Sequence, residues 1–273
     1  STTEYGAKSS DKAVASYIDF PYFTAAGWYH KMLSPALQNK GLLDILPESE
    51  NFAINDLMPA IAKGGFISEA EKNQIAEKMA YYTGLSKKVI IQHNLEIPNS
   101  FFWKELLRNK SGTTIGRLDS RYMGIDKKEA GDSPDYNSEL TSWLHSFTPA
   151  INLYIKEHLN FNTDVKYNMF GPVHPWDFRN NNTREELRKA MATNPYLNVL
   201  FQAGYYDGAT TYFNTKYTMW QVDPSGKLKD RMSFKGYRSG HMMYLRKPDL
   251  KSANDDIRNF IKASSSNGKP AKY

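Results

Sequence analysis

The chain has no cysteine among its 273 residues. Without cysteine there is no disulfide framework, no thiolate metal site and no cysteine nucleophile. The sequence also lacks an apolar run of the length that a membrane-spanning helix requires, so we expect no membrane partner. A hydrophobic content of 40% with 14% aromatic residues is nevertheless ample for a packed core. The composition therefore indicates a globular protein of one large or two ordinary domains.

Clustered positive charge is also missing, although the chain is basic overall. The formal net charge is +6 and the pI is about 9.1. A basic surface attracts nucleic acid, but lysine and arginine are scattered among acidic residues here, in runs no longer than a pair. No RNA-binding signature is present. We therefore expect no nucleic-acid partner.

Apolar residues three and four positions apart predict a mainly helical region between residues 22 and 159. The predicted helices are 22–33, 52–62, 68–82, 86–93, 99–109 and 138–159, with a short strand or extended segment at 113–118. Ser68 followed by Glu71 has the spacing of a capping box, which defines one helix start. The last helix is amphipathic, with an apolar face formed by Leu140, Trp143, Leu144, Phe147, Ile151, Tyr154, Ile155 and His158.

After residue 162 the pattern changes to alternating strands and helices. The predicted elements are an extended segment 165–170, helix 183–192, strand 197–203, helix 210–222, strand 231–237 and helix 249–263. The continuous apolar run at 197–203 is typical of a strand buried in a parallel sheet. We therefore divide the chain into a loose N-terminal segment 1–21, a helical lid 22–162 and an α/β core 163–273. Two strands alone would leave an apolar edge open, so we expect the chain to be unstable by itself.

Two polar residues stand just after the two predicted strands. Asp207 ends the run Phe-Gln-Ala-Gly-Tyr-Tyr-Asp, and His241 lies in Arg-Ser-Gly-His-Met-Met-Tyr. A lone aspartate at a strand end is usually a turn residue, but an acid and then a histidine, each after its own strand, follow the order of the Ser-Asp-His triad of α/β-hydrolases. In such a triad the histidine takes the serine proton, and the carboxylate fixes the imidazole tautomer. Asp207 and His241 are therefore the candidate catalytic acid and base.

A nucleophile for this pair is absent from the sequence. No serine lies in a Gly-x-Ser-x-Gly elbow, and the spacing around Ser239 is wrong for one. Tyr205 and Tyr206 precede the acid; we expect at least one of their hydroxyls to bond within the site, with core packing alone equally open.

The chain resembles the serine carboxypeptidase family, especially its bacterial branch, over nearly its whole length. The Gly-Tyr-Tyr-Asp-x-Ala-Thr and Gly-His-Met-Met-Tyr segments are the most specific, and further segments lie at 20–31, 118–124, 173–177 and 194–200. The first of these is similar to the family segment that opens the lid after the elbow strand. The family's Asn-Gly-Gly-Pro-Gly and Glu-Ser-Tyr-Gly segments, which carry the oxyanion hole and the nucleophile, have no match.

The resemblance implies an α/β fold, namely the C-terminal part of an α/β-hydrolase sheet with a large, mainly helical lid. It implies a peptide substrate, no cofactor, and a serine on a missing upstream segment or companion chain. Asp207 and His241 are then the catalytic residues, with Tyr205, Tyr206 and Met242 as substrate-binding candidates. A cysteine-free member fits a bacterial exported protein, so we expect a periplasmic or secreted location. The chain alone is expected to be inactive.

Other interpretations stay open. The same scaffold carries acyltransferases and esterases, and a degenerate hydrolase half can serve as a non-catalytic binding module. We expect no metal site, because His174 and Asp177 are three apart with no third ligand at motif spacing, and we assign structural roles to the other histidines. Asp119 and Arg121 are interpreted mainly as a local ion pair that shapes a turn.

Overall fold

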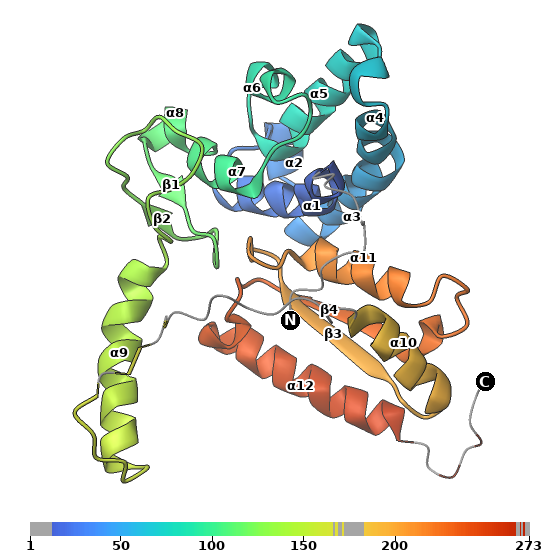
Figure 1. Ribbon diagram of the computed structural model, residues 1–273. Helices are drawn as coiled ribbons and strands as arrows, with labels where there is room; N and C mark the ends of the chain where they lie inside the picture. Colours follow the sequence, from blue (N-terminus) through green and yellow to red (C-terminus); the bar gives the residue numbers. More distant parts are fainter. Residues whose placement is uncertain are drawn as a thin grey trace.

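The structure is a computed structural model that describes residues 13–165, 167–168, 171, 183–265, 268 and 270. It combines a helical part with a small parallel sheet that carries helices on both faces (Figure 1). The motif at 173–177 and most of the N-terminal segment, residues 1–12, lie outside the described residues. Half of the predicted extended segment 165–170 also lies outside the described residues. Its described residues, 165, 167 and 168, form neither helix nor strand.

The region from residue 13 to residue 157 is mainly helical, as predicted. Its elements are α1 (Ala13–Tyr29), α2 (Pro35–Gln38), α3 (Leu42–Phe52), the π-helical η1 (Ala53–Leu57), α4 (Met58–Ala62), η2 (Gly64–Phe66), α5 (Glu69–Thr83), α6 (Lys87–Gln92), α7 (Asn99–Glu105), α8 (Arg108–Ser111), β1 (Thr114–Ile115), β2 (Met123–Gly124) and α9 (Leu140–Glu157). The predicted helix start is confirmed, because the Ser68 hydroxyl accepts a hydrogen bond from the Glu71 amide at 3.2 Å. The Glu71 carboxylate, which a capping box turns back to Ser68, pairs with Lys63 instead. The predicted strand at 113–118 is reduced to β1, which pairs antiparallel with β2.

The prediction of a loose segment up to residue 21 is wrong from Ala13 onward. Helix α1 begins there and continues through Pro21, the last residue of the predicted loose segment. Proline in a helix interior removes one backbone hydrogen bond and normally breaks the helix. Here burial compensates for that loss, since Ile18, Phe20 and Tyr22 around the proline are each at most 1% exposed.

Helices α2 and α3 were not predicted, and helix 52–62 begins earlier than expected. Helix α3 runs from Leu42 through the π turn η1 into α4, so residues 42–62 are continuously helical. The π turn lies directly before the segment with Pro59, and an extra residue in a turn relieves the clash that proline causes in the preceding carbonyls.

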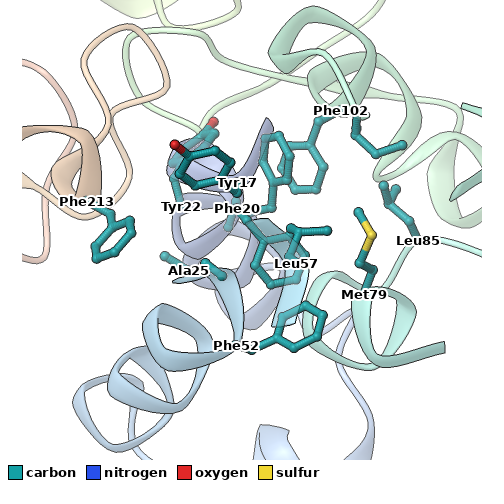
Figure 2. Packing of buried hydrophobic residues seen from close by; sticks show 14 of the residues in the cluster. Tyr17, Phe20, Tyr22, Ala25, Phe52, Leu57, Met79, Leu85, Phe102 and Phe213 are labelled. Carbon is teal, nitrogen blue, oxygen red and sulfur yellow. The ribbon is translucent and has the colours of Figure 1, made fainter. Parts of the chain in front are cut away.

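The main core surrounds α1. Figure 2 shows its aromatic side chains enclosed by residues of α3, η1, α5, α7 and α11. The Phe23 ring stacks on Phe102 of α7 at 4.1 Å between centroids, and Phe20 lies 5.2 Å from Phe52 of α3. Each fully buried side chain of this size contributes roughly 1.5–3 kcal/mol, so α1 is the element on which the helical part is assembled.

The C-terminal part contains a parallel pair of strands. Its elements are α10 (Thr183–Thr193), β3 (Val199–Gly204), α11 (Tyr212–Val222), η3 (Lys229–Arg231), β4 (Met232–Tyr237), η4 (Met243–Leu245) and α12 (Lys247–Ser264). Strands β3 and β4 pair in register from Val199 opposite Met232 to Gly204 opposite Tyr237. Both predicted strands and all three predicted helices of this region are therefore present.

A second, smaller core lies between this sheet and helices α10 and α11. Met191, Val222 and Leu228 are buried there against Val199 and Phe201 of β3. Helix α12 covers the opposite face of the sheet. On that side the Gln202 amide donates to the Tyr237 hydroxyl, which donates to Asp256 of α12.

Helix α9 stands apart from both cores (Figure 1). Of its predicted apolar face only Trp143 is buried, whereas Leu144 and Tyr154 are 39% and 50% exposed. No described helix is long and apolar enough to cross a membrane.

Candidate functional site

The candidate site forms where β3 and β4 end side by side. Asp207 lies three residues after β3, and His241 lies four residues after β4. Because parallel strands share one carboxyl edge, the two following loops meet at that edge. The predicted contact is present: His241 Nδ1 lies 2.9 Å from Asp207 Oδ2.

The carboxylate of Asp207 is held by four donors. Its Oδ1 accepts from the amides of Ala209 and Thr210 at 2.8 and 3.1 Å, in the manner of an aspartate that caps a turn. Its Oδ2 accepts from the Thr210 hydroxyl at 2.7 Å as well as contacting His241. The side chain of Asp207 is 5% exposed, so these bonds fix the orientation of the carboxylate.

His241 is the half-open partner, since its side chain is 45% exposed. The hydrogen bond that His241 donates to Asp207 raises the pKa of His241 above its ordinary value, because the adjacent carboxylate favours the charged imidazolium. Burial and the nearby charge of Arg117 act in the opposite direction. With Nδ1 turned to Asp207, the other ring nitrogen is left to interact with a nucleophile or substrate.

A third segment, residues 117–120, lies between the two loops. The Arg117 carbonyl accepts from the Gly208 amide at 2.9 Å, and the Ser120 amide donates to the Tyr206 carbonyl at 2.9 Å. The Leu118 carbonyl accepts from the His241 amide at 2.7 Å. The segment therefore fixes the Asp207 loop and the His241 loop relative to each other.

Glycine is required where these backbones approach. A Cβ atom on Gly240 would meet the Leu118 carbonyl oxygen and the side chain of Asp119, and one on Gly204 would meet the carbonyl oxygens of Ser239 and Gly240. The sequence places glycine at both positions, so the loops can pack in direct backbone contact.

The ion pair interpreted from the sequence is present next to this segment. Arg121 donates to both carboxylate oxygens of Asp119, at 2.9 and 2.6 Å. Its guanidinium also donates to the Arg238 carbonyl and lies 5.4 Å from the centre of the Tyr206 ring. The pair therefore does more than shape a turn, because it connects this turn to the loop before His241.

The two tyrosines before Asp207 are packing residues. Tyr206 is 2% exposed beneath Arg121 and 5.3 Å from the Tyr29 ring, and burial raises its pKa to about 12. Tyr205 packs edge-on against Tyr212 at 5.0 Å. Neither hydroxyl bonds to a described residue, so of the two readings of these tyrosines the structure favours core packing.

Met242 lines an apolar cavity of about 490 Å³ between the His241 loop and α9. The lining residues are Phe147, Ala150, Ile151, Tyr154, Tyr167, Met242 and Tyr244. The exposed apolar face of α9 is thus one wall of a pocket that begins next to the candidate base.

Thr210 was missed by the sequence analysis. Its hydroxyl donates to Asp207 and lies 3.3 Å from His241 Nδ1, so it contacts both candidate residues. An aspartate followed three residues later by threonine is a turn signature that would have drawn attention to it.

Ser239 is not placed as a nucleophile. It is fully buried, and its hydroxyl donates to Asp249 of α12. Within the described part of the chain no serine hydroxyl lies in hydrogen-bond reach of His241, and no cluster of three or more metal-ligating side chains occurs.

The other described histidines are not part of the candidate site. Three of them, His30, His93 and His158, make contacts within the fold. His30 Nε2 lies 2.6 Å from the Ser120 carbonyl, and burial lowers the pKa of His30 below its ordinary value. His93 contacts the Val89 carbonyl, and His158 stacks on Tyr154.

Comparison with protein-family models, curated proteins and solved structures gives no match to this chain. The likeness to serine carboxypeptidases therefore rests on the sequence motifs, and the function has to be argued from the site.

Proposed function

We propose that this chain supplies the acid and base of a Ser-His-Asp hydrolase of the serine carboxypeptidase type. The nucleophilic serine comes from a companion segment or chain. The observation that carries the proposal is the contact between a buried carboxylate, Asp207, and a half-exposed imidazole, His241, at the shared carboxyl edge of two parallel strands. Such a pair orients and charges an imidazole that is open on its other side.

In the proposed reaction the serine oxygen attacks the carbonyl carbon of the last peptide bond of a peptide. The second ring nitrogen of His241 takes the hydroxyl proton and passes it to the nitrogen of the departing amino acid as the carbon–nitrogen bond breaks. Water then attacks the acyl-serine, gives its proton to the same nitrogen, and the serine is restored with its proton. Throughout, Asp207 holds the Nδ1 hydrogen and stabilises the imidazolium.

The apolar cavity beside Met242 supports a peptide substrate with an apolar side chain near the cleaved bond. Its walls come from α9 and from the residues that follow His241, so a side chain bound there lies next to the candidate base. We place the protein in the periplasm or outside a bacterial cell, as the family likeness implies.

The test is turnover of blocked dipeptides across acidic and neutral pH. The purified, mass-verified chain is expected to show none, because it lacks the nucleophile and each missing oxyanion donor costs roughly 3 kcal/mol of transition-state stabilisation. Activity is expected when the companion is present, and His241→Gln in this chain should abolish it. Turnover by the chain alone, or full activity of the His241→Gln variant, would contradict the proposal.

A further inference from the structure

Thr210 holds both carboxylate oxygens of Asp207. Its backbone amide donates to Oδ1 at 3.1 Å, and its hydroxyl donates to Oδ2 at 2.7 Å. The last bond of an aspartate side chain has only a weak preferred angle, so hydrogen bonds from outside decide how the carboxylate plane lies. The Ala209 amide holds Oδ1 alone. Thr210 is therefore the residue that fixes the plane of the carboxylate.

The same hydroxyl faces the imidazole. Thr210 Oγ1 lies 3.3 Å from His241 Nδ1, and this nitrogen lies 2.9 Å from Asp207 Oδ2. A hydroxyl has one hydrogen to donate and two lone pairs that accept. Because the hydrogen of Thr210 is donated to Oδ2, only its lone pairs are left for Nδ1. Both groups that face Nδ1 are then acceptors, which requires a hydrogen on this nitrogen.

This arrangement determines the state of the whole ring. In a neutral imidazole with its hydrogen on Nδ1, the nitrogen Nε2 is the acceptor. The side chain of His241 is 45% exposed, so enclosure by the fold leaves the ring room to turn. The contacts at Nδ1 restrain it instead. Thr210 contributes to them directly, by accepting, and indirectly, by holding the carboxylate.

The neighbouring threonine has a different partner. Thr211 is 1% exposed, and its hydroxyl donates to Asp19 of α1 at 2.7 Å. Thr210 is only half-buried, and its hydroxyl contacts the candidate acid and base. A β-branched side chain has few allowed χ1 angles, so threonine keeps its hydroxyl in place better than serine does. Two consecutive hydroxyls thus serve two separate parts of the molecule.

We propose that Thr210 is a positioning residue of the candidate site. Its hydroxyl holds Asp207 and the ring of His241 in the arrangement in which Nδ1 carries a hydrogen and Nε2 is free to accept one. Thr210 acts through His241 and does not itself touch the reacting atoms. This inference rests on the proposed function in one respect: its kinetic test takes His241 to be the base of the reaction.

The first experiment follows the Nδ1 hydrogen of His241 by NMR in the full chain, at a pH above the pKa of His241. Exchange of this hydrogen with water requires the contact with Asp207 to open. Thr210→Val removes the hydroxyl at nearly constant shape. We expect exchange to become about 3- to 10-fold faster, the effect of losing one hydrogen bond. Thr210→Ser keeps a hydroxyl and should lie between the Val variant and wild type.

Thr211→Val is the matched control. It removes the neighbouring hydroxyl and its bond to Asp19, so the chain should unfold at a lower urea concentration while exchange at Nδ1 keeps the wild-type rate. Circular dichroism verifies that all variants fold. An unchanged rate in Thr210→Val would overturn the inference. Equal acceleration in Thr211→Val would overturn it as well, because the effect would then be a general loosening of the fold.

The second experiment measures turnover of blocked dipeptides by the protein isolated together with its companion. In Thr210→Val we expect kcat to fall about 3- to 10-fold and KM to stay unchanged, because the lost hydrogen bond acts on the base and not on the substrate. A rise in KM with unchanged kcat would show that Thr210 binds substrate and would overturn its role as a positioning residue. If exchange at Nδ1 accelerates as expected but the wild-type protein has no turnover, the positioning by Thr210 stands and the hydrolase proposal fails.

Discussion

At the scale of single residues, the site is built from groups that hold one carboxylate and one imidazole. Asp207 receives donors from its own turn and from His241, and Thr210 contacts both. These bonds leave the carboxylate little freedom to turn away from the ring. The raised pKa of His241 follows from the same contact.

Replacing Asp207 tests that contact directly. In Asp207→Asn the charged partner is lost, so the pKa of His241 should fall below its wild-type value because burial and Arg117 then act unopposed. The measurement is NMR titration of the His241 ring. Asp255→Asn, an exposed carboxylate on α12, is the matched control and should leave the titration unchanged.

Gly240→Ala should destabilise the fold by about 1–3 kcal/mol, because the added methyl group meets the Leu118 carbonyl and Asp119. The same change should weaken the His241 amide bond to Leu118 and so disturb the His241 titration. Urea unfolding provides the free energy. Gly65→Ala is the control, since a Cβ there has nothing within 4 Å and the cost should stay within about 0.5 kcal/mol. Equal stability of the two variants would show that the loops are not in the close contact described.

At the scale of elements, a buried carboxylate connects the helical part to the sheet part. Asp19 of α1 accepts from the Thr211 hydroxyl, at the N-terminus of α11, at 2.7 Å and from the Asn99 amide of α7 at 2.8 Å. Burial raises the pKa of Asp19 to about 6, and the two hydrogen bonds lower it only in part.

Asp19 should therefore make stability fall as pH rises. The folded chain holds this proton up to about pH 6, whereas the unfolded chain releases it near pH 3.8, so the free energy of unfolding falls between these values and is level above them. The change amounts to about 3 kcal/mol, at 1.36 kcal/mol for each pKa unit.

Asp19→Asn should remove this fall, so its stability relative to wild type should increase from pH 4 to pH 7. The Asn99 amide can rotate to accept the new N–H, since its Oδ1 has no partner among the described residues. Denaturant unfolding at the two pH values is the measurement, with the exposed Asp132→Asn as control. A constant difference between Asp19→Asn and wild type would contradict the assignment.

The sequence predicted those parts of the fold that depend on neighbours in the chain. Ser68 and Glu71 defined a helix start, and the apolar run at 197–203 defined β3, because both signals are local. The contact between Asp207 and His241 was predictable because each followed its own strand. The 117–120 segment between their loops was not, because its partners lie about 90 and 120 residues further along the chain. The extent of α1 was missed because Pro21 is tolerated only through tertiary burial.

At the scale of the whole molecule, a helical part and a two-stranded parallel sheet share a boundary (Figure 1). The contact between Asp207 and His241 lies at the carboxyl ends of the two strands. Among the described residues, the imidazole of His241 is 45% exposed there. We propose that the companion that carries the serine meets the imidazole of His241 on this open side.

We propose that His241 activates a serine that lies on another polypeptide, outside residues 1–273. The most direct measurement treats the protein, isolated under native conditions from its source, with a fluorophosphonate and then determines intact masses after denaturation. We predict that the label is on a companion polypeptide, that residues 1–273 carry none, and that His241→Gln abolishes the labelling. A label on any serine of residues 1–273, or labelling that persists in His241→Gln, would contradict the account.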